Sequence, residues 1–318
     1  MKQIFITGGA GFIGSHLCEK IFNNYKNTKI IILDKLSYSG NLFFLTNIIK
    51  SKRVKFIKGN ILDYKKYNNF LKNSDIAINV AAESHVDRSF TNSLLFTKTN
   101  TFGAHVFFQE CLEKKVKKII HVSTDEVYGE IIKGSANELS LLNPTNPYSA
   151  SKAAAEVILN SYKNFYSNKI ITIRANNIYG IRQYPEKIIP SFIFNLLTNK
   201  KILIHGNGFN IRCYLSVSDF TDAVLLLMKK NVNGIYNIGN TKYYKNLDIA
   251  NIICKFLDKD YKKNVKFVKD RPFNDKRYSI EINKIRKLGW KPKKELINDL
   301  PEIIDWYKKN LKIFKKKN

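Results

Sequence analysis

Tyr148 and Lys152 are the two residues whose types and spacing point most directly to chemistry. They lie four positions apart, which places both side chains on one face of a helix. A nearby lysine cation, together with a positively charged nicotinamide, should stabilise the phenolate form of the tyrosine. Such a tyrosine can take a proton from a hydroxyl group while hydride leaves the same carbon for a nicotinamide. Taken alone, the pair is equally consistent with two solvated surface residues.

A second candidate group is the adjacent acidic pair Asp125 and Glu126, which follows Thr124. The group comes directly after a predicted strand at 119–122, and doubly wound sheets place their sites at the carboxyl ends of strands. Two neighbouring carboxyl groups can divide acid and base roles if their environments separate their pKa values. The alternative is a solvated acidic turn.

Gly8, Gly11 and Gly14 follow a predicted strand at 4–7 and open a predicted helix at 12–22. Such glycines permit a tight turn, close approach of a pyrophosphate and close packing of helix on sheet. The next predicted strand, 30–33, leads into Asp34, whose carboxylate can bind ribose hydroxyls and would repel a 2′-phosphate. The pattern predicts an NAD site; the alternative is a glycine-rich turn beside a solvated aspartate.

Short β-branched runs alternate with longer helical patterns over the first half of the chain. We expect strands at 4–7, 30–33, 54–57, 76–80, 119–122 and 170–173, and helices at 12–22, 94–113 and 148–165. Continuous apolar strands separated by helices predict an α/β fold, a doubly wound parallel sheet of the Rossmann type. We expect an NAD-binding domain at 1–178. A smaller mixed lobe at 179–318, with helices near 247–257 and 299–311, would mainly bind substrate and return some segments to the sheet.

The 318 residues carry 54 Lys and Arg against 26 Asp and Glu, a formal charge of +28. Such an excess raises the possibility of a nucleic-acid partner. The basic residues are spread along the chain, however, with no zinc-finger spacing or aromatic-basic motif, so we expect no nucleic acid. The four cysteines form no metal-binding pattern, which favours a reducing compartment and no metal. With no signal peptide visible and only short apolar runs, we predict a cytoplasmic protein without a membrane partner.

Eight stretches in chain order carry a family resemblance: TGGAGFIGSHL, DKLSYSGN, AAESHVDRS, VSTDEVYG, NPYSASKAAAE, NNIYGIRQYPEKIIP, HGNGFNIRCYL and DRPFNDKRY. Through them the chain resembles the nucleotide-diphosphate-glucose 4,6-dehydratases, which are extended short-chain dehydrogenases/reductases, over nearly its whole length. The resemblance implies NAD-dependent dehydration of a nucleotide-diphosphate-glucose to a 4-keto-6-deoxy sugar nucleotide, a lyase reaction of deoxysugar routes such as rhamnose biosynthesis. It also implies a homodimer formed through a four-helix bundle.

The resemblance assigns roles to individual residues. Tyr148, supported by Lys152 and Thr124, would take the C4 hydroxyl proton, Glu126 the C5 proton, and Asp125 would protonate the departing C6 hydroxyl. The implied NAD contacts are Gly8, Gly11, Phe12, Ile13, Gly14, Asp34, Lys35, Ser37, Asn60, Ile61, Ala81, Ala82, Thr99, Tyr148, Lys152 and Ile178. The implied substrate contacts are Ser84, Thr124, Asn177, Glu186, Lys187, His205, Arg212, Asn246, Arg271 and Asn274.

The chain also departs from the family pattern. Asn60 stands where an aspartate is common, and its amide oxygen can still accept a hydrogen bond from adenine. Phe273 and Asn274 resemble the UDP-glucose type better than the bacterial thymidine type, so we favour UDP-glucose over dTDP-glucose. Two other functions remain open. One is a nucleotide-sugar 4-epimerase or decarboxylase, against which the acidic pair speaks; the other is a non-catalytic NAD-binding protein that associates with nucleic acid.

Overall fold

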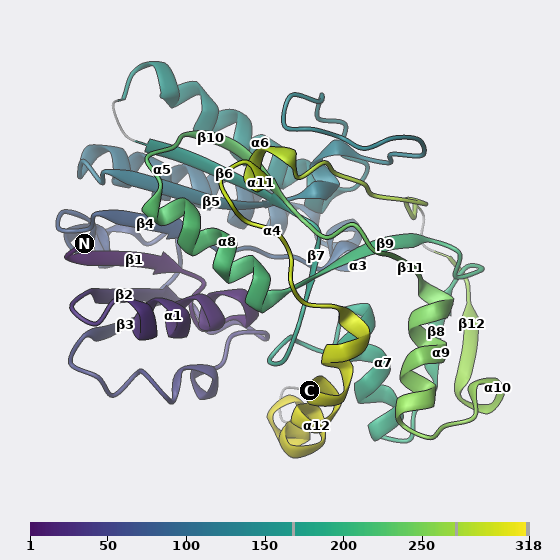
Figure 1. Ribbon diagram of the computed structural model, residues 1–318. Helices are drawn as coiled ribbons and strands as arrows, with labels where there is room; N and C mark the ends of the chain where they lie inside the picture. Colours follow the sequence, from purple (N-terminus) through teal and green to yellow (C-terminus); the bar gives the residue numbers. More distant parts are fainter. Residues whose placement is uncertain (167–168, 271–272, 316–318) are drawn as a thin grey trace.

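The computed structural model describes residues 1–166, 169–270 and 273–315. Its centre is a seven-stranded parallel sheet with the strand order β10-β6-β5-β4-β1-β2-β3 (Figure 1). The strands are β1 (Gln3–Thr7), β2 (Lys29–Asp34), β3 (Val54–Lys58), β4 (Ile76–Asn79), β5 (Lys118–Thr124), β6 (Lys169–Ala175) and β10 (Gly234–Ile238). β1 and β4 are buried throughout, as expected for strands covered on both faces. The predicted doubly wound fold is confirmed.

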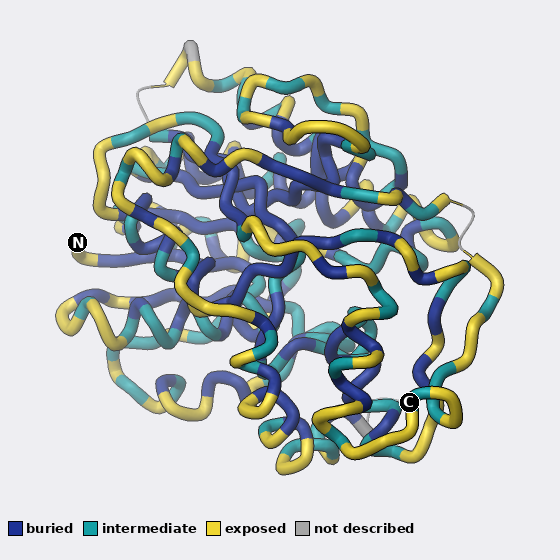
Figure 2. The backbone as a smooth tube through the Cα atoms, turned by 45° about the vertical axis from the view of Figure 1, so that its right-hand side comes forward, coloured by how far each residue is buried: buried dark blue, intermediate teal, exposed yellow. Residues whose placement is uncertain are grey.

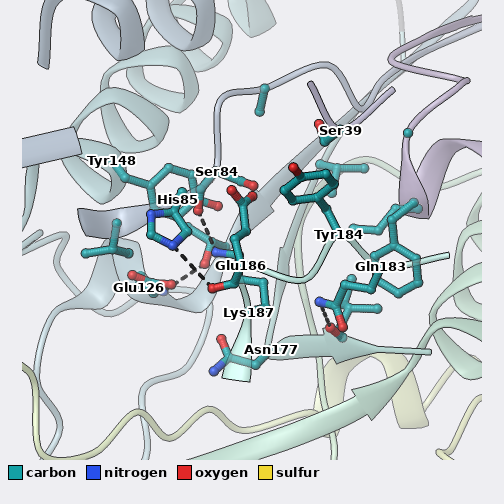
Figure 3. A pocket seen from close by; sticks show the side chains of 18 of the residues that line it. Ser39, Ser84, His85, Glu126, Tyr148, Asn177, Gln183, Tyr184, Glu186 and Lys187 are labelled. Carbon is teal, nitrogen blue, oxygen red and sulfur yellow. Dashed lines mark hydrogen bonds between the residues drawn. The ribbon is translucent and has the colours of Figure 1, made fainter. Parts of the chain in front are cut away.

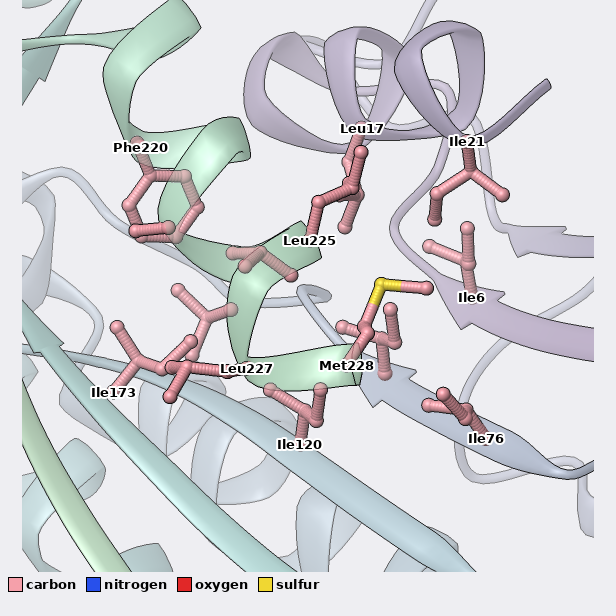
Figure 4. Close-up of a cluster of buried hydrophobic side chains, with 14 of the residues drawn as sticks. Ile6, Leu17, Ile21, Ile76, Ile120, Ile173, Phe220, Leu225, Leu227 and Met228 are labelled. Carbon is pink, nitrogen blue, oxygen red and sulfur yellow. The ribbon is translucent and has the colours of Figure 1, made fainter. Parts of the chain in front are cut away.

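One face of the sheet is covered by α1 (Phe12–Asn24) and α8 (Val217–Lys229), with α11 (Asn283–Arg286) beside β10. Leu17 and Ile21 of α1 and Leu227 of α8 meet strand residues such as Ile6 in one apolar core (Figure 4). Full burial of each such side chain contributes roughly 1.5–3 kcal/mol. This core holds the start of α1 against the end of β1, where the glycine turn lies.

The opposite face is covered by α2 (Asn68–Leu71), α5 (Ala104–Glu113) and α6 (Pro147–Ser161), which is followed by η5 (Tyr162–Asn164). The helix predicted at 94–113 is divided into α4 (Ser93–Phe96), the π-helix η3 (Thr97–Gly103) and α5. π-Helical turns are frequent at functional sites. Here the turn buries Asn100, whose amide donates to the Glu83 carbonyl oxygen at 2.9 Å and accepts from the Glu83 N–H at 2.8 Å.

The second half of the chain contains short strands and helices beyond the two helices that the sequence analysis predicted. It forms β7 (Asn177–Tyr179), β8 (Ile202–His205), β9 (Ile211–Ser216), β11 (Tyr243–Lys245), β12 (Val265–Val268), α7 (Ile188–Leu197), α9 (Asn246–Phe256), α10 (Tyr261–Asn264) and α12 (Leu296–Lys315). β11, β9 and β7 form one small sheet, and β12 pairs with β8. α9 and α12 confirm the helices expected near 247–257 and 299–311. Ser216 caps α8. The apolar side chains of α8 are buried against the main sheet.

Buried residues are concentrated in the central strands and where α7, α9 and α12 pack against one another. The connecting loops are mostly half-buried or exposed (Figure 2). The remaining short elements are η1 (Leu42–Leu45), η2 (Tyr64–Lys66), α3 (Val86–Thr91) and η4 (Asp125–Tyr128). Across the described residues, we find no helix that is both long and apolar enough to cross a membrane. The four cysteines are all buried and free of disulfides.

Candidate active site

A single continuous cavity runs from the glycine turn after β1 to the small sheets of the second lobe. It is lined by every described residue of the predicted NAD and substrate sets: Gly8, Gly11, Phe12, Ile13, Gly14, Asp34, Lys35, Ser37, Asn60, Ile61, Ala81, Ala82, Ser84, Thr99, Thr124, Tyr148, Lys152, Asn177, Ile178, Glu186, Lys187, His205, Arg212, Asn246 and Asn274. Glu126 lines it too, whereas Asp125 does not. Arg271 lies outside the described residues.

The glycine turn forms a cradle that side chains would fill. Gly8 has a φ of +68°, and a Cβ there would lie 2.7 Å from the Ala81 nitrogen at the end of β4. A Cβ on Gly14 would lie 2.1 Å from the Gly8 carbonyl oxygen. Gly11 begins α1 without any side-chain cap, so the first N–H groups of the helix are free to bind an anion. The cradle lies where the strand order reverses between β1 and β4, the usual place for a dinucleotide.

Asp34 ends β2 at the rim of this cradle. Its Oδ2 accepts from the Ala10 N–H at 2.9 Å and its Oδ1 accepts from the Leu36 N–H at 2.8 Å. These bonds orient a carboxylate that also lines the cavity and is 8% exposed. A carboxylate oxygen has more than one acceptor site, so the ribose hydroxyls of NAD can still bind. The glycine cradle, the free helix N-terminus and Asp34 together fit NAD.

The acidic pair lies on the tight 3₁₀ turn η4, which directly follows β5. Thr124 begins this turn, and its hydroxyl accepts from the Glu126 N–H at 3.3 Å. Because a 3₁₀ helix has about three residues per turn, adjacent side chains point about 120° apart. Glu126 lines the cavity, and its carboxylate accepts from the Asn146 amide at 3.4 Å. Asp125 does not line it and accepts from the Asn176 amide instead.

The environment of Asp125 favours the protonated acid. Burial is the main cause that raises the pKa of Asp125 to about 7, and the neighbouring Glu126 charge adds to it. Hydrogen bonds from Asn176 and Thr124 and the charge of Arg212 act in the opposite direction. At neutral pH, Asp125 is thus placed to carry a transferable proton.

Tyr148 and Lys152 project from the first turns of α6. Asn146 caps this helix by accepting from the Ser149 N–H at 2.9 Å, and Pro147 occupies its first turn. The Lys152 ammonium donates to the Val122 carbonyl oxygen of β5 at 2.6 Å. Burial lowers the pKa of Lys152 to about 8, so the ammonium remains mostly charged at neutral pH.

In the protein alone, the surroundings of Tyr148 disfavour its anion. Burial, and then the charge of Glu126, raise the pKa of Tyr148 above its ordinary value, while a hydrogen bond from Thr124 acts in the opposite direction. The phenol is 9% exposed and cannot be solvated as an anion. The expected stabilisation thus requires the positive ring of a bound nicotinamide as well as Lys152.

The loop after β7 carries Lys187 and Glu186 across the cavity toward Ser84 and His85 (Figure 3). The Lys187 ammonium donates to the Ser84 carbonyl oxygen at 2.6 Å, and His85 contacts the Glu186 carbonyl oxygen at 3.2 Å. Lys187 also lies 5.8 Å from the centre of the Tyr148 ring. The loop therefore brings charged side chains beside the Tyr148 end of the cavity.

The far end of the cavity contains His205 of β8, Arg212 of β9, Asn246 of α9 and Asn274. The guanidinium of Arg212 donates to the Asn274 side-chain oxygen at 3.3 Å and packs over the Tyr278 ring at 4.6 Å. A planar guanidinium held in this way can bind two oxygens of a diphosphate.

Several cavity residues were missed by the sequence analysis. They are Asn146, Asn176, Gln183, Tyr184, His85 and Tyr278. Asn146 had a usable signal, since an asparagine before Pro147 is typical of a helix start. Tyr278 and Asn176 had none, because their positions depend on contacts between distant segments. Among the described residues, we find no group of three or more His, Cys, Asp or Glu side chains that could hold a metal ion.

The family model for GDP-mannose 4,6 dehydratase matches residues 5–301 of this chain. The chain is 43% identical to the dTDP-D-glucose 4,6-dehydratase of Dictyostelium discoideum, an alignment that covers 98% of this chain and 82% of that protein. It is 42% identical to the trifunctional UDP-glucose 4,6-dehydratase/UDP-4-keto-6-deoxy-D-glucose 3,5-epimerase/UDP-4-keto-L-rhamnose-reductase of Arabidopsis thaliana, over 97% of this chain. The chain spans about half of that plant protein, 47% of its length.

Among solved structures, the chain resembles the dTDP-glucose 4,6-dehydratase of Streptomyces venezuelae, which was crystallised with NAD and a second ligand bound. The two chains are 35% identical and superpose with a TM-score of 0.96, covering 99% of this chain and 100% of that one. The agreement extends over the sheet and the second lobe together.

Proposed function

Because the chain belongs to the GDP-mannose 4,6 dehydratase family, we propose that it is an NAD-dependent nucleotide-diphosphate-glucose 4,6-dehydratase. The relatives and the solved structure described above carry glucose 4,6-dehydratase names, which supports glucose as the sugar. The product would be the corresponding 4-keto-6-deoxy sugar nucleotide. No metal takes part in the proposed reaction.

The acidic pair supports this function more than any other single observation. Asp125 and Glu126 lie on one turn beside Tyr148, but they face different surroundings and only Glu126 lines the cavity. Elimination of water across C5 and C6 needs a base at C5 and an acid at the C6 hydroxyl. A simple 4-epimerisation needs neither group, which is why the pair favours dehydration.

In the first stage, Tyr148 takes the proton of the C4 hydroxyl while the charged Lys152 favours the resulting phenolate. The Val122 carbonyl oxygen accepts a hydrogen bond from the Lys152 ammonium at 2.6 Å and fixes its position. The glycine cradle and Asp34 would hold NAD, which would supply a positive nicotinamide ring and a reversible hydride acceptor for C4 and C6 of the sugar. Thr124 supports Tyr148 through the hydrogen bond between them.

In the second stage, the ketone at C4 acidifies the C5 proton. Glu126 removes that proton, and Asp125 protonates the C6 hydroxyl so that it leaves as water. Burial, and then the charge of Glu126, raise the pKa of Asp125 to about 7, so a substantial fraction carries its proton at neutral pH, whereas Glu126 lines the cavity. We propose that Arg212 and Lys187 bind the sugar diphosphate, with Asn274 among the other substrate contacts. Ser84, Asn177, Glu186, His205 and Asn246 complete the proposed substrate contacts.

Mass spectrometry of the purified protein incubated with UDP-glucose, dTDP-glucose and CDP-glucose tests the proposal directly. We expect loss of one water molecule and a 4-keto group in the product from at least one of them. Intact starting material with all three substrates would remove the assignment. Recovery of UDP-galactose from UDP-glucose would replace it with the epimerase.

A Glu126→Gln variant tests whether Glu126 acts only in water elimination and not in oxidation at C4. The amide cannot take the C5 proton, so we expect water loss to fall roughly 10²–10⁴-fold. Oxidation at C4 should survive, detected as a 4-keto sugar that retains its C6 oxygen. Glu113→Gln, on the exposed end of α5, is the matched control and should behave as wild type. Undiminished water loss in Glu126→Gln would exclude Glu126 as the base.

For the nucleotide, we propose UDP-glucose before dTDP-glucose. The proposal rests on Phe273 and Asn274, which line the cavity and resemble the UDP-glucose type. The relatives carry both names, so their similarity favours neither base. A competition assay with equal concentrations of the two substrates decides between them, and preferential turnover of dTDP-glucose would reverse the order.

We further propose a homodimer in which α5 and α6 pair with those of a second copy. Phe107, Phe108 and Leu159 are buried against the sheet, but Phe102 is 57% and Val157 59% exposed. These two side chains leave apolar surface that a second copy would cover. Sedimentation analysis tests the proposal, since a monomer at micromolar concentration would contradict it.

The proposed domain division places NAD contacts mainly in residues 1–178 and nucleotide-sugar contacts mainly in 179–318. α8 and β10 return to the main sheet from the second part. The four unpaired cysteines support the proposed reducing, cytoplasmic compartment.

A further inference from the structure

The two oxygens of the Asp125 carboxyl have different neighbours. Oδ2 accepts a hydrogen bond from the Asn176 amide nitrogen at 2.7 Å, and Oδ1 accepts one from the Thr124 hydroxyl at 3.4 Å. A hydroxyl can turn and accept instead, whereas an amide NH₂ can only donate. Asp125 is 2% exposed and does not itself line the cavity, whereas Thr124 on one side of its carboxyl and Asn176 on the other both do. Oδ1 is therefore the oxygen on the Thr124 side of the carboxyl.

The Asn176 amide is held in one orientation. The backbone N–H of Asn240 donates to its side-chain oxygen at 3.0 Å, and the N–H of Asn176 itself donates to the Ile238 carbonyl oxygen of β10 at 3.1 Å. Gly239 packs directly against the amide, since a Cβ there would lie 2.0 Å from the Asn176 oxygen. Because a backbone N–H can only donate, the amide oxygen must face Asn240 and the NH₂ must face Asp125.

A protonated carboxyl has one oxygen that donates and one that only accepts, and an amide NH₂ cannot accept. The oxygen facing Asn176 must therefore remain the acceptor. On the basis of the proposed dehydratase function, we infer that Asn176 is a positioning residue. It confines the acidic proton of Asp125 to Oδ1, on the side of Thr124 and Tyr148. From that side Oδ1 would pass its proton to the C6 hydroxyl of the sugar.

The elimination breaks the C5–H and C6–O bonds of the sugar. The C5–H bond breaks and its electron pair forms the C5–C6 double bond, while the proton passes to Glu126. The C6–O bond breaks as the oxygen takes the Oδ1 proton, and water leaves. Asp125 remains as a carboxylate, which the Asn176 N–H stabilises.

Charged and titratable groups face Asp125 from three elements. Glu126 lies next to it on η4, Tyr148 faces it from α6, and Arg212 and Cys213 face it from β9. Burial and Glu126 raise the pKa of Asp125 to about 7, and Asn176 limits that rise. Since elimination needs the protonated acid, its rate should fall as pH rises above about 7. Removing the Asn176 donor should move this decline to higher pH.

The variant Asn176→Asp tests the inference with almost no change in shape. It keeps an oxygen for the Asn240 N–H but replaces the NH₂ by a carboxyl oxygen. Two adjacent carboxyls then share one proton between them, which withdraws it from Oδ1. We expect formation of the 4-keto-6-deoxy product to fall roughly 10–100-fold, with the decline of rate shifted to higher pH.

The decisive measurement is the ratio of deuterium exchange at C5 to product formation, which a merely structural role of Asn176 would not change. In D₂O, Glu126 should still exchange the C5 proton, so the recovered nucleotide-glucose should gain deuterium while product formation is slow. The ratio of exchange to product should rise at least tenfold over wild type. Asn176→Ser, whose hydroxyl is too short to keep the contact with Asp125, should raise the ratio too and serves if Asn176→Asp folds poorly.

Asn237→Asp is the matched control. Asn237 is fully buried on the neighbouring β10, accepts from the Tyr128 hydroxyl at 2.7 Å and makes no contact with Asp125. It should lower thermal stability without changing the ratio of exchange to product or the pH profile. If Asn176→Asp and Asn176→Ser keep the wild-type ratio of exchange to product, the inference about Asn176 is overturned, while the dehydratase function still stands. Absence of product from the wild-type protein with all three nucleotide-glucoses would instead overturn the dehydratase function and the inference with it.

Discussion

The half of the cavity that we propose binds NAD has a surface made largely of backbone, whereas the proposed substrate half has a surface made of side chains. In the cofactor half, the contacts come from the ends of β1 and β2 and the start of α1, where backbone N–H groups and missing side chains form the surface. In the substrate half, single side chains such as Arg212 and Asn246 reach in from separate elements. A surface made of backbone tolerates no added atoms, whereas a surface made of side chains can lose one contact at a time.

Tyr148 lies where the halves meet, and its substitution should have the largest effect. Tyr148→Phe removes the group that takes the C4 hydroxyl proton, so we expect turnover to fall by about 10³-fold. Binding in each half should persist, because the ring remains packed against Phe96. Turnover and NAD content should be measured together, with the exposed Tyr64→Phe as control. Turnover within tenfold of wild type would contradict the role of Tyr148.

Gly14→Ala tests whether the proposed cofactor half tolerates an added side-chain atom, which its close backbone packing argues against. Its Cβ would lie 2.1 Å from the Gly8 carbonyl oxygen, so backbone must move. We expect the free energy of unfolding to fall by about 1–3 kcal/mol and NAD to be lost on purification.

Gly11→Ala provides the comparison for Gly14→Ala within the same turn. Its Cβ would lie 3.3 Å from that oxygen, so stability should change less while NAD binding still weakens. Calorimetry and cofactor content separate the two effects. Equal stability of the two variants would show that helix-on-sheet packing does not limit this turn.

Arg212→Lys should affect the substrate half alone. Lysine keeps the charge but loses the planar fork that binds two oxygens. We expect the KM for the nucleotide sugar to rise roughly tenfold, equivalent to about 1.4 kcal/mol, with NAD affinity unchanged. Isothermal titration with each ligand checks this separation. A matching loss of NAD affinity would mean that the halves are coupled.

Neutralising exposed lysines far from both halves should have the smallest effect. Lys262 and Lys263 lie on the exposed α10, and Lys262→Gln with Lys263→Gln should change kcat/KM by less than about twofold because salt screens such charges. The assay should be repeated at low and physiological ionic strength. A large loss confined to low salt would assign part of the +28 charge to substrate attraction.

The first half of the fold was predictable because its signals are local. The glycine turn, the β-branched runs and Asp34 lie within short windows, and β1, α1 and β2 form as expected. α8 had an available signal in Ser216 and the apolar run that follows it. β10 is different, since nothing local shows that its five residues join the edge of a sheet whose neighbour, β6, ends some sixty residues earlier.

The sequence by itself determined which chemical groups are present and their spacing along helices and strands. That was enough for the nucleotide fold, the Tyr148–Lys152 pair and the acidic pair, because neighbours in sequence share one local geometry. Only the tertiary structure decided that Glu126 faces the cavity while Asp125 faces Asn176, and that burial opposes ionisation of Tyr148. Those properties depend on the dielectric surroundings and on donors from distant strands, which a linear pattern does not contain.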